Sequence, residues 1–206
     1  MIPLVLDLLD RKLVIFGGGQ VALRKARYFQ DEVEVTVVSL DFDPGFDDMR
    51  VMTIWGDAWE HAPDLIDASD LVIAATDDEK LNQWLCDMAR SKRKLYNQAN
   101  GLGNFLIPSV VDKGTYLIAV STLGRSPALA RYLRRRLEEE LGEELELMAL
   151  LQERLRAELR SAVPERKDRE SLLRMILDDV EVWELLPVDQ ERAMERAREL
   201  VRRSRK

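Results

Sequence analysis

Residues 12–26, KLVIFGGGQVALRKA, decide the fold of this chain. The apolar run at 12–16 has the length of a buried strand, and the amphipathic stretch after the three glycines predicts a helix. The segment Gly17–Ala22 matches the pattern G-x-G-x-x-A, in which Gly17 allows the tight turn, Gly19 lets the backbone approach a pyrophosphate, and the alanine lets the helix pack closely on the strand. This order of strand, turn and helix predicts a dinucleotide-binding unit. The alternative is a glycine turn without a ligand.

Alternating strands and helices continue along the first half of the chain. Short runs rich in apolar and β-branched residues predict four more strands: 33–39, 51–55, 70–75 and 94–97. A helix is expected from about Asp78 to Ser91. Strands that alternate with helices favour a parallel sheet with crossover connections. We therefore predict an α/β fold, a Rossmann-like parallel sheet with helices on both faces, over residues 1–112.

The second half has a different pattern. Residues 114–122 predict one more strand, and Ser126 and Pro127 fit the N-cap and first position of a helix that Gly142 ends. Further helices are expected over three stretches: 143–162, 168–186 and 188–203. The sequence therefore divides into residues 1–112, a small segment at 113–142 and a helical C-terminal region at 143–206.

Composition excludes several classes of protein. The 206 residues carry a net charge of −7, which argues against binding of bulk nucleic acid. No apolar run has the length of a transmembrane helix, and the start of the chain, with Asp7 and Asp10, does not resemble a signal peptide. Cys86 is the only cysteine, which excludes an internal disulfide and fits a reducing cytoplasm. Because His61 is the only histidine, a histidine-rich metal site is excluded as well.

The end of the second predicted strand indicates which dinucleotide is bound. An acidic residue that binds the ribose hydroxyls usually stands about 20 residues after the glycine turn. Leu40 and Asp41 follow the strand there, and the next residues contain further aspartates but no lysine or arginine: Asp43, Asp47 and Asp48. These acids would repel a 2′-phosphate, so we predict NAD rather than NADP. A solvated acidic loop is the alternative.

Thr76 follows the fourth predicted strand, at the edge where doubly wound sheets bind their ligands. We expect it to contact cofactor or substrate. Asp78 is explained more simply as the N-cap of the next helix.

Several motifs in fixed order join these observations. They are the glycine turn with Arg24 and Lys25, Ala74–Asp78 with Asn82, Asn97, Ile107–Ser109, and Ser121–Arg131 with Leu133 and Arg134. Together they resemble the precorrin-2 dehydrogenase family, the N-terminal module of siroheme synthases, over about residues 3–140. The helical remainder is similar to that of the free-standing dehydrogenases, so we expect no fused methyltransferase.

The resemblance implies NAD-dependent oxidation of precorrin-2 to sirohydrochlorin in siroheme biosynthesis. It also implies a homodimer whose interface is built by residues 113–142. The predicted cofactor-binding residues are Gly17, Gly18, Gly19, Gln20, Val21, Leu40, Asp41 and Thr76.

A polyanionic tetrapyrrole needs cations. Arg125, Ser126 and Arg131 are predicted to hold its carboxylates, because they stand at or near a helix N-terminus that also attracts anions. The resemblance implies that Asn97 also binds the substrate. The alternative for Arg131 is a solvated basic face, Arg131–Arg136, paired with Glu138–Glu140.

One residue departs from the family pattern. Asn100 stands where the relatives carry an aspartate after the fifth strand. An asparagine cannot accept a proton as a base or supply an anionic metal ligand. We therefore expect Asn100 to act in catalysis by positioning substrate, and we expect neither a metal site nor ferrochelatase activity.

Other functions are a dehydrogenase of another substrate, a bifunctional dehydrogenase and chelatase, or a non-catalytic NAD sensor with a helical partner-binding tail. A cobalt or iron chelatase without oxidase activity is a further alternative, against which the asparagine at position 100 argues. Structural roles are expected for His61 in an exposed polar loop and for Cys86 on a buried helix face. Trp183 and an apolar stripe are expected in a core or a dimer contact: Leu172, Leu173, Ile176 and Leu177.

Overall fold

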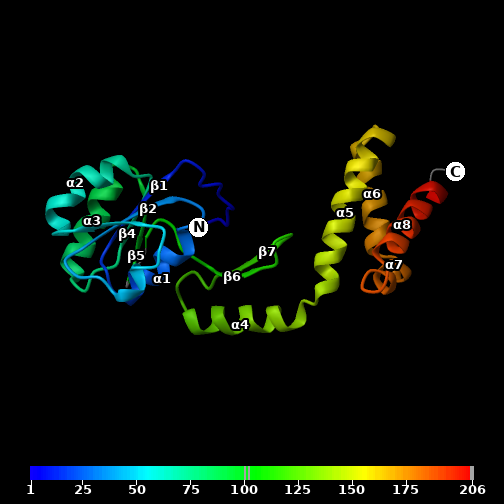
Figure 1. The fold of residues 1–206 in the computed structure, drawn as a ribbon. Helices are drawn as coiled ribbons and strands as arrows, with labels where there is room; N and C mark the ends of the chain where they lie inside the picture. Colours follow the sequence, from blue (N-terminus) through cyan, green and yellow to red (C-terminus); the bar gives the residue numbers. More distant parts are fainter. Residues whose placement is uncertain (100, 102, 205–206) are drawn as a thin grey trace. The chain divides into compact units, whose positions relative to one another are not determined.

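The computed structural model describes residues 1–99, 101 and 103–204, so the prediction for Asn100 lies outside the described residues. The chain divides into two compact units, Met1–Ile107 and Pro108–Lys206 (Figure 1). The functional division into 1–112, 113–142 and 143–206 stays a prediction.

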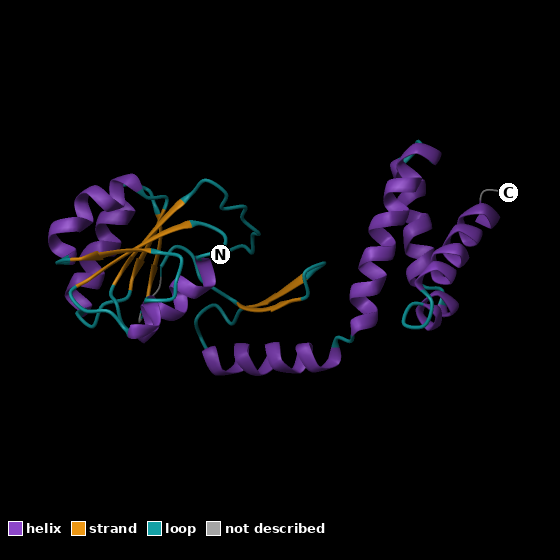
Figure 2. Cartoon of the chain, viewed as in Figure 1, coloured by secondary structure: helices purple, strands orange, loops and turns teal. Residues whose placement is uncertain are grey.

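A five-stranded parallel sheet forms the first unit, in the order β3-β2-β1-β4-β5. Its strands are β1 (Lys12–Phe16), β2 (Glu34–Ser39), β3 (Met52–Trp55), β4 (Leu71–Ala74) and β5 (Leu95–Gln98). The connecting elements are α1 (Gln20–Phe29), the 3-10 helix η1 (Pro44–Phe46), α2 (Ala58–Ala68) and α3 (Glu79–Ser91). Figure 2 shows these helices around the orange strands, and the predicted Rossmann-like fold is confirmed.

Both faces of the sheet are covered because its central strands are apolar on both sides. Leu13 and Ile15 of β1 pack with α1 and β2 residues. Val14 and Phe16 pack instead with α2 and α3. Such continuous apolar runs are typical of parallel strands buried between two helical layers.

The strand register brings three turns to one edge of the sheet. Phe16, the last residue of β1, lies opposite Val38 of β2 and Ala74 of β4. The glycine turn, the loop from Leu40 and the loop from Ala75 therefore start at the same level. In doubly wound sheets this carboxyl edge is where ligands bind.

Helix α2 corrects one expectation. His61 lies on this helix and not in a loop. Asp57 caps the helix, since its carboxylate accepts a hydrogen bond of 3.0 Å from the Trp59 amide. Ala62 and Ile66 are fully buried against the sheet, and this burial outweighs the helix-breaking tendency of Pro63 inside the same helix.

The second unit begins with a two-stranded antiparallel sheet, β6 (Ser109–Asp112) and β7 (Leu117–Val120), of which the sequence predicted only the second strand. Helix α4 (Pro127–Glu140) follows, and the predicted N-cap is confirmed because the Ser126 hydroxyl accepts a hydrogen bond of 3.3 Å from the Leu129 amide. The predicted helix break at Gly142 is also confirmed, since α5 (Glu143–Ala162) starts after it.

Three further helices complete the chain: α6 (Arg166–Leu177), α7 (Val180–Leu185) and α8 (Gln190–Ser204). A single helix over 168–186 was therefore a wrong prediction. Asp179 interrupts it, because its carboxylate caps α7 at the Val182 amide (3.0 Å) and forms an ion pair of 2.8 Å with Arg196.

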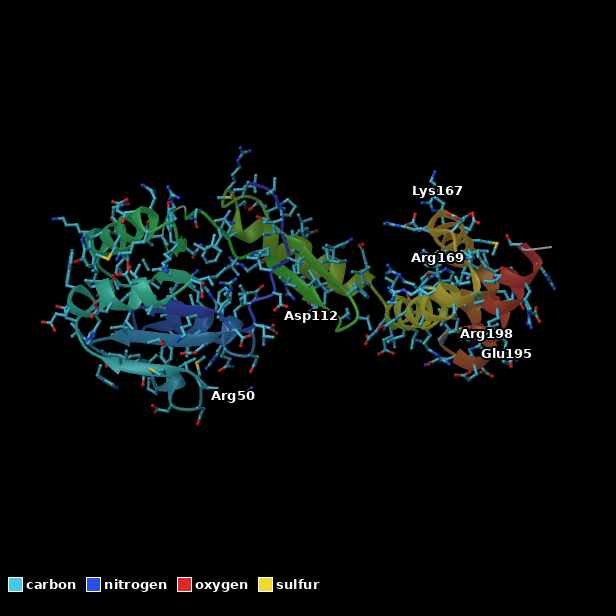
Figure 3. All side chains as sticks on the ribbon, turned by 90° about the horizontal axis from the view of Figure 1, so that it is seen from above. Arg50, Asp112, Lys167, Arg169, Glu195 and Arg198 are labelled. Carbon is cyan, nitrogen blue, oxygen red and sulfur yellow. The ribbon has the colours of Figure 1, made fainter. Side chains whose placement is uncertain are left out.

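Helices α5–α8 share an apolar core of their own. Leu155, Ile176 and Met194 are among its fully buried side chains. Of the predicted stripe, Leu172 and Ile176 lie in this core, whereas Leu177 is exposed and its carbonyl accepts a hydrogen bond of 2.8 Å from the Trp183 indole. Arg198 of α8, labelled in Figure 3, donates to Glu158 of α5 at 3.0 Å. Among the described residues, no helix is both long and apolar enough to span a membrane.

Candidate functional site

A cleft of about 870 Å³ opens at the carboxyl edge of the parallel sheet. It is lined by the glycine turn, the β2–η1 loop, the β3–α2 turn and the β4–α3 loop: Gly17–Val21, Val38–Pro44, Gly56–Ala58, Ala75–Asp77 and Leu81. All eight predicted cofactor-binding residues lie in this lining. Their contacts with a cofactor stay a prediction, but the fold brings them together from three separate turns.

The packing of the turn requires glycine at its first two positions. Gly17 has a φ of +117°, and an added Cβ would lie 2.3 Å from the carbonyl oxygen of Ala75. A Cβ on Gly18 would lie 2.0 Å from the carbonyl oxygen of Asp41. These two glycines are thus explained by the protein's own packing.

Gly19 is different, because an added Cβ would meet no atom within 4 Å. Its φ of −83° is ordinary for any residue. Nothing in the described packing therefore requires glycine there. The open space in front of Gly19 fits the close approach of a pyrophosphate to the backbone.

The N-terminus of α1 offers hydrogen-bond donors at the same place. Its N-cap, Gly19, has no side chain to cap the first amides, and no acidic residue stands in the first turn. The first amides of a helix lack intrahelical partners and carry partial positive charge, which favours a phosphate. The cleft therefore fits the diphosphate of a dinucleotide.

Two aspartates line the cleft after β2, with different surroundings. The Asp43 carboxylate already has partners within the protein, because it accepts hydrogen bonds from the Gly45 amide at 2.8 Å and from the Gln20 side chain. The backbone amide of Asp43 donates to the Gly18 carbonyl at 2.8 Å. Asp41 is exposed, and its Oδ1 accepts a bond of 3.0 Å from the Phe42 amide. Asp41 is thus the better placed of the two to accept bonds from ribose hydroxyls.

The described residues that line the cleft include no lysine or arginine and four aspartates: Asp41, Asp43, Asp57 and Asp77. A 2′-phosphate would find no counter-charge there. The electrostatics of the lining therefore favour NAD.

Thr76 is held in the cleft wall by Asn82, a side chain that the sequence analysis noted only as part of a motif. Asn82 is 1% exposed. Its Oδ1 accepts bonds from the Thr76 amide (3.0 Å) and hydroxyl (2.8 Å), and its Nδ2 donates to the Thr76 carbonyl (2.9 Å). Asp78 is the N-cap of α3, as predicted, and accepts from the Lys80 amide at 2.8 Å. Because all three of these bonds join the buried Asn82 side chain to Thr76, they fix the conformation of the β4–α3 loop.

Asn97 of β5 is also buried, with 5% exposure. Its Nδ2 donates to the Phe105 carbonyl at 3.0 Å, and its Oδ1 accepts from the Lys25 ammonium at 2.7 Å. Burial, and secondarily the charge of Arg24, lower the pKa of Lys25 to about 8. The predicted contact of Asn97 with substrate stays a prediction. Lys25, which lies 72 positions away in the chain, was noted in the sequence only as a motif residue.

The remaining predicted substrate residues lie in the second unit. Arg125 is exposed, and its amide donates to Thr122 at the start of the turn before α4. Arg131 is exposed on α4, and the structure shows no ion pair for it among the described residues. The predicted i,i+4 pairing of its neighbours is confirmed: Arg134–Glu138, Arg135–Glu139 and Arg136–Glu140.

Cys86 is buried on α3, as predicted, and burial raises the pKa of its thiol to about 11. Such a thiol stays protonated and unreactive at neutral pH. Within the described part of the chain, no group of three or more histidine, cysteine, aspartate or glutamate side chains is arranged to hold a metal ion.

Comparison with known proteins agrees with this geometry. Residues 4–109 match a family described as putative NAD(P)-binding, and residues 118–140 match the sirohaem biosynthesis protein central family. A precorrin-2 dehydrogenase of Methanosarcina barkeri is 38% identical over 207 residues, which cover 95% of this chain and 91% of that protein.

Two other similarities extend the comparison. Siroheme synthase 2 of Klebsiella pneumoniae is 38% identical over 169 residues, which cover 77% of this chain but only 36% of the synthase. The solved structure of SirC, a precorrin-2 dehydrogenase, has the same fold with a TM-score of 0.76 at 22% identity, covering 97% of this chain and all of that one. With its NAD(P)-binding sheet, its central siroheme segment and its full-length match, the chain belongs to the precorrin-2 dehydrogenase family.

Proposed function

We propose that this protein oxidises precorrin-2 to sirohydrochlorin with NAD as the hydride acceptor. The observation that carries the proposal is the cleft at Gly19, whose open space and uncapped helix N-terminus fit a dinucleotide, in a chain similar over 95% of its length to a precorrin-2 dehydrogenase. The described cleft lining, which is acidic and free of lysine and arginine, supports NAD over NADP.

The chemistry divides between cofactor and protein. Bound NAD supplies the hydride acceptor, and the protein supplies position and electrostatics. Oxidation removes a hydride and a proton from precorrin-2. The α1 amides and Gly19 would hold the diphosphate, and Asp41 would accept bonds from the ribose, while the loop at Thr76, braced by Asn82, forms the wall after β4.

The substrate carries several carboxylates, for which the second unit offers exposed cations. We assign carboxylate binding to Arg125 and Arg131 and to Ser126 at the N-terminus of α4. Asn100, by its place after β5, is assigned to positioning the substrate by hydrogen bonds. Turnover of Asn100→Ala and Asn100→Asp tests this role, and unchanged rates in both would remove Asn100 from the mechanism.

We further propose that the protein does not insert iron. The side chain of Asn100 is neutral and cannot serve as the anionic ligand or base that an aspartate would supply. Incubation of sirohydrochlorin with ferrous iron tests this directly. Metal insertion faster with wild-type protein than in buffer would restore the bifunctional alternative.

We also propose that the protein is a cytoplasmic homodimer. A buried, reduced Cys86 suits a reducing compartment. Strand β7 and helix α4 expose apolar side chains that fit an interface between copies: Leu117, Leu129, Tyr132 and Leu133. Sedimentation of wild type and of Leu129→Asp tests the assembly, and a monomeric wild-type protein would contradict it.

Anaerobic absorption spectra test the main proposal. Precorrin-2 mixed with the protein and NAD should give sirohydrochlorin, and the same mixture with NADP should react more slowly. The Gly19→Ala variant is a matched control, because it should fold but bind NAD poorly. Binding of NAD without any conversion would favour an NAD sensor or another substrate.

A further inference from the structure

Lys25 is a half-buried cation whose neighbours do not neutralise it. An ammonium group has three donors. One of them is accounted for by the 2.7 Å bond to the neutral side-chain oxygen of Asn97. Among the described residues, no carboxylate lies within ion-pair distance of Lys25, whereas five of the other ten lysines and arginines of the first unit pair with an aspartate or glutamate.

The position of Lys25 is fixed from two sides. It projects from the second turn of α1, whose first residue lines the cleft. Asn97, which holds it, lies opposite Ile73 of β4, two residues before the cleft-lining Ala75. Because Asn97 also donates to the Phe105 carbonyl, its oxygen is held in place for the ammonium group. A buried amide that both donates and accepts in this way is typical of a positioning residue.

Asn97 places the Lys25 ammonium group on the β4–β5 side of the sheet, next to the cleft but outside its lining. Asp41 and the rest of the β2–η1 loop line the cleft on the β2 side of the sheet, and the β4–α3 loop lines it on the β4 side. A dinucleotide that spans the sheet between them places its second half toward β4 and β5. A substrate that gives up a hydride must therefore lie near the ends of β4 and β5, where Asn97 holds Lys25.

We propose that Lys25, positioned by Asn97, is a binding site for a carboxylate of the tetrapyrrole substrate. The inference rests on the proposed function, because it takes the polycarboxylate as the ligand. Desolvation of an unpaired cation is costly, and a bound carboxylate removes that cost by forming a charge-assisted hydrogen bond.

The charge state of Lys25 predicts a specific pH dependence for carboxylate binding. Its pKa is lowered to about 8, first by desolvation and then by the charge of Arg24 on the same helix. The elements packed against it contribute the neutral Asn97 from β5 and the Phe105 carbonyl that Asn97 binds. Above pH 8 the free lysine is neutral, so its attraction for a carboxylate is lost.

Equilibrium binding of the product, sirohydrochlorin, without NAD tests the assignment independently of turnover. We expect Lys25→Met to weaken product binding at neutral pH by about tenfold or more, the loss expected for one charge-assisted hydrogen bond. NAD affinity should not change. Lys12→Met is the matched control, because Lys12 lies at the amino end of β1, where it pairs with Glu34 at 3.8 Å, and it should bind product like wild type.

The pH profile keeps the test valid if Lys25→Met does not fold. Wild-type affinity for the product should fall as the pH rises through about 8, whereas Lys25→Arg, which stays charged, should keep its affinity. Equal binding by Lys25→Met and wild type, or a wild-type profile identical to that of Lys25→Arg, would overturn the assignment. If wild type neither converts precorrin-2 nor binds the product, the proposed function itself fails; if wild type does both, only the role of Lys25 is at stake.

Discussion

The glycine turn permits a sharp test, because Gly17 and Gly19 should respond to the same substitution in opposite ways. Gly17→Ala would put a Cβ 2.3 Å from the carbonyl oxygen of Ala75, at a φ of +117°. Gly19→Ala would put a Cβ into open space at a φ of −83°. Gly17→Ala should therefore lower the free energy of unfolding, and Gly19→Ala should lower the affinity for NAD.

The magnitudes follow from these geometries. For Gly17→Ala we expect a loss of about 1–3 kcal/mol for the backbone conformation and about 1–3 kcal/mol more for the overlap with backbone atoms. For Gly19→Ala we expect a stability within about 1 kcal/mol of wild type, because the restriction of the unfolded chain by alanine is opposed by the preference for glycine over alanine at a helix N-cap. Its NAD affinity should fall by about tenfold to a hundredfold, as the methyl group displaces the diphosphate from its charged hydrogen bonds.

Two assays separate these effects. Urea denaturation gives the free energy of unfolding, and calorimetric titration gives the NAD dissociation constant. Wild-type affinity for NAD in a stable Gly19→Ala variant would refute the reasoning, because the space before Gly19 would then not hold the diphosphate. A Gly17→Ala variant as stable as wild type would refute the packing argument.

Three further substitutions test the remaining geometry. Asn82→Ala removes the three bonds to Thr76, so calorimetry should show weaker NAD binding and urea denaturation a loss of about 1–3 kcal/mol; the nearby core variant Cys86→Ala should lose stability without losing affinity. Because the pKa of Lys25 falls from 10.5 to about 8 on folding, the unfolded chain binds more protons between these values, and stability should rise by at most about 3 kcal/mol from pH 8 to 10.5. That rise should be absent in Lys25→Met, and its persistence in denaturation curves would contradict the shift. Asp41→Arg should lower the ratio of NAD to NADP affinity, and an unchanged ratio would remove Asp41 from cofactor selection.

Local patterns in the sequence predicted the first unit well. The central strands β1 and β4 are almost entirely apolar runs, so strand ends such as Phe16 and Ala74 were placed within about a residue. The caps Asp78 and Ser126 were also predictable, because capping depends on residues three positions apart. Helix α2 was missed, because Pro63 argues against a helix in this segment. The burial of the helix against the sheet, which stabilises it, is a tertiary effect.

The contacts that complete the site depend on tertiary structure and could not be predicted. Lys25 and Asn97 meet only because α1 packs over the face of the sheet on which β5 presents Asn97. The brace between Asn82 and Thr76 is local, but the sequence alone does not show that the amide is buried. Likewise, the break at Asp179 reflects its ion pair with Arg196 from a later helix.

The central claim is that this protein transfers a hydride from precorrin-2 to NAD. Its most direct test is an anaerobic reaction with limiting precorrin-2, in which NADH and sirohydrochlorin are both quantified. The account predicts that the two products form in equal amounts and only when protein and NAD are both present. Sirohydrochlorin formed at the same rate without NAD, or NAD bound with neither product formed, would contradict it.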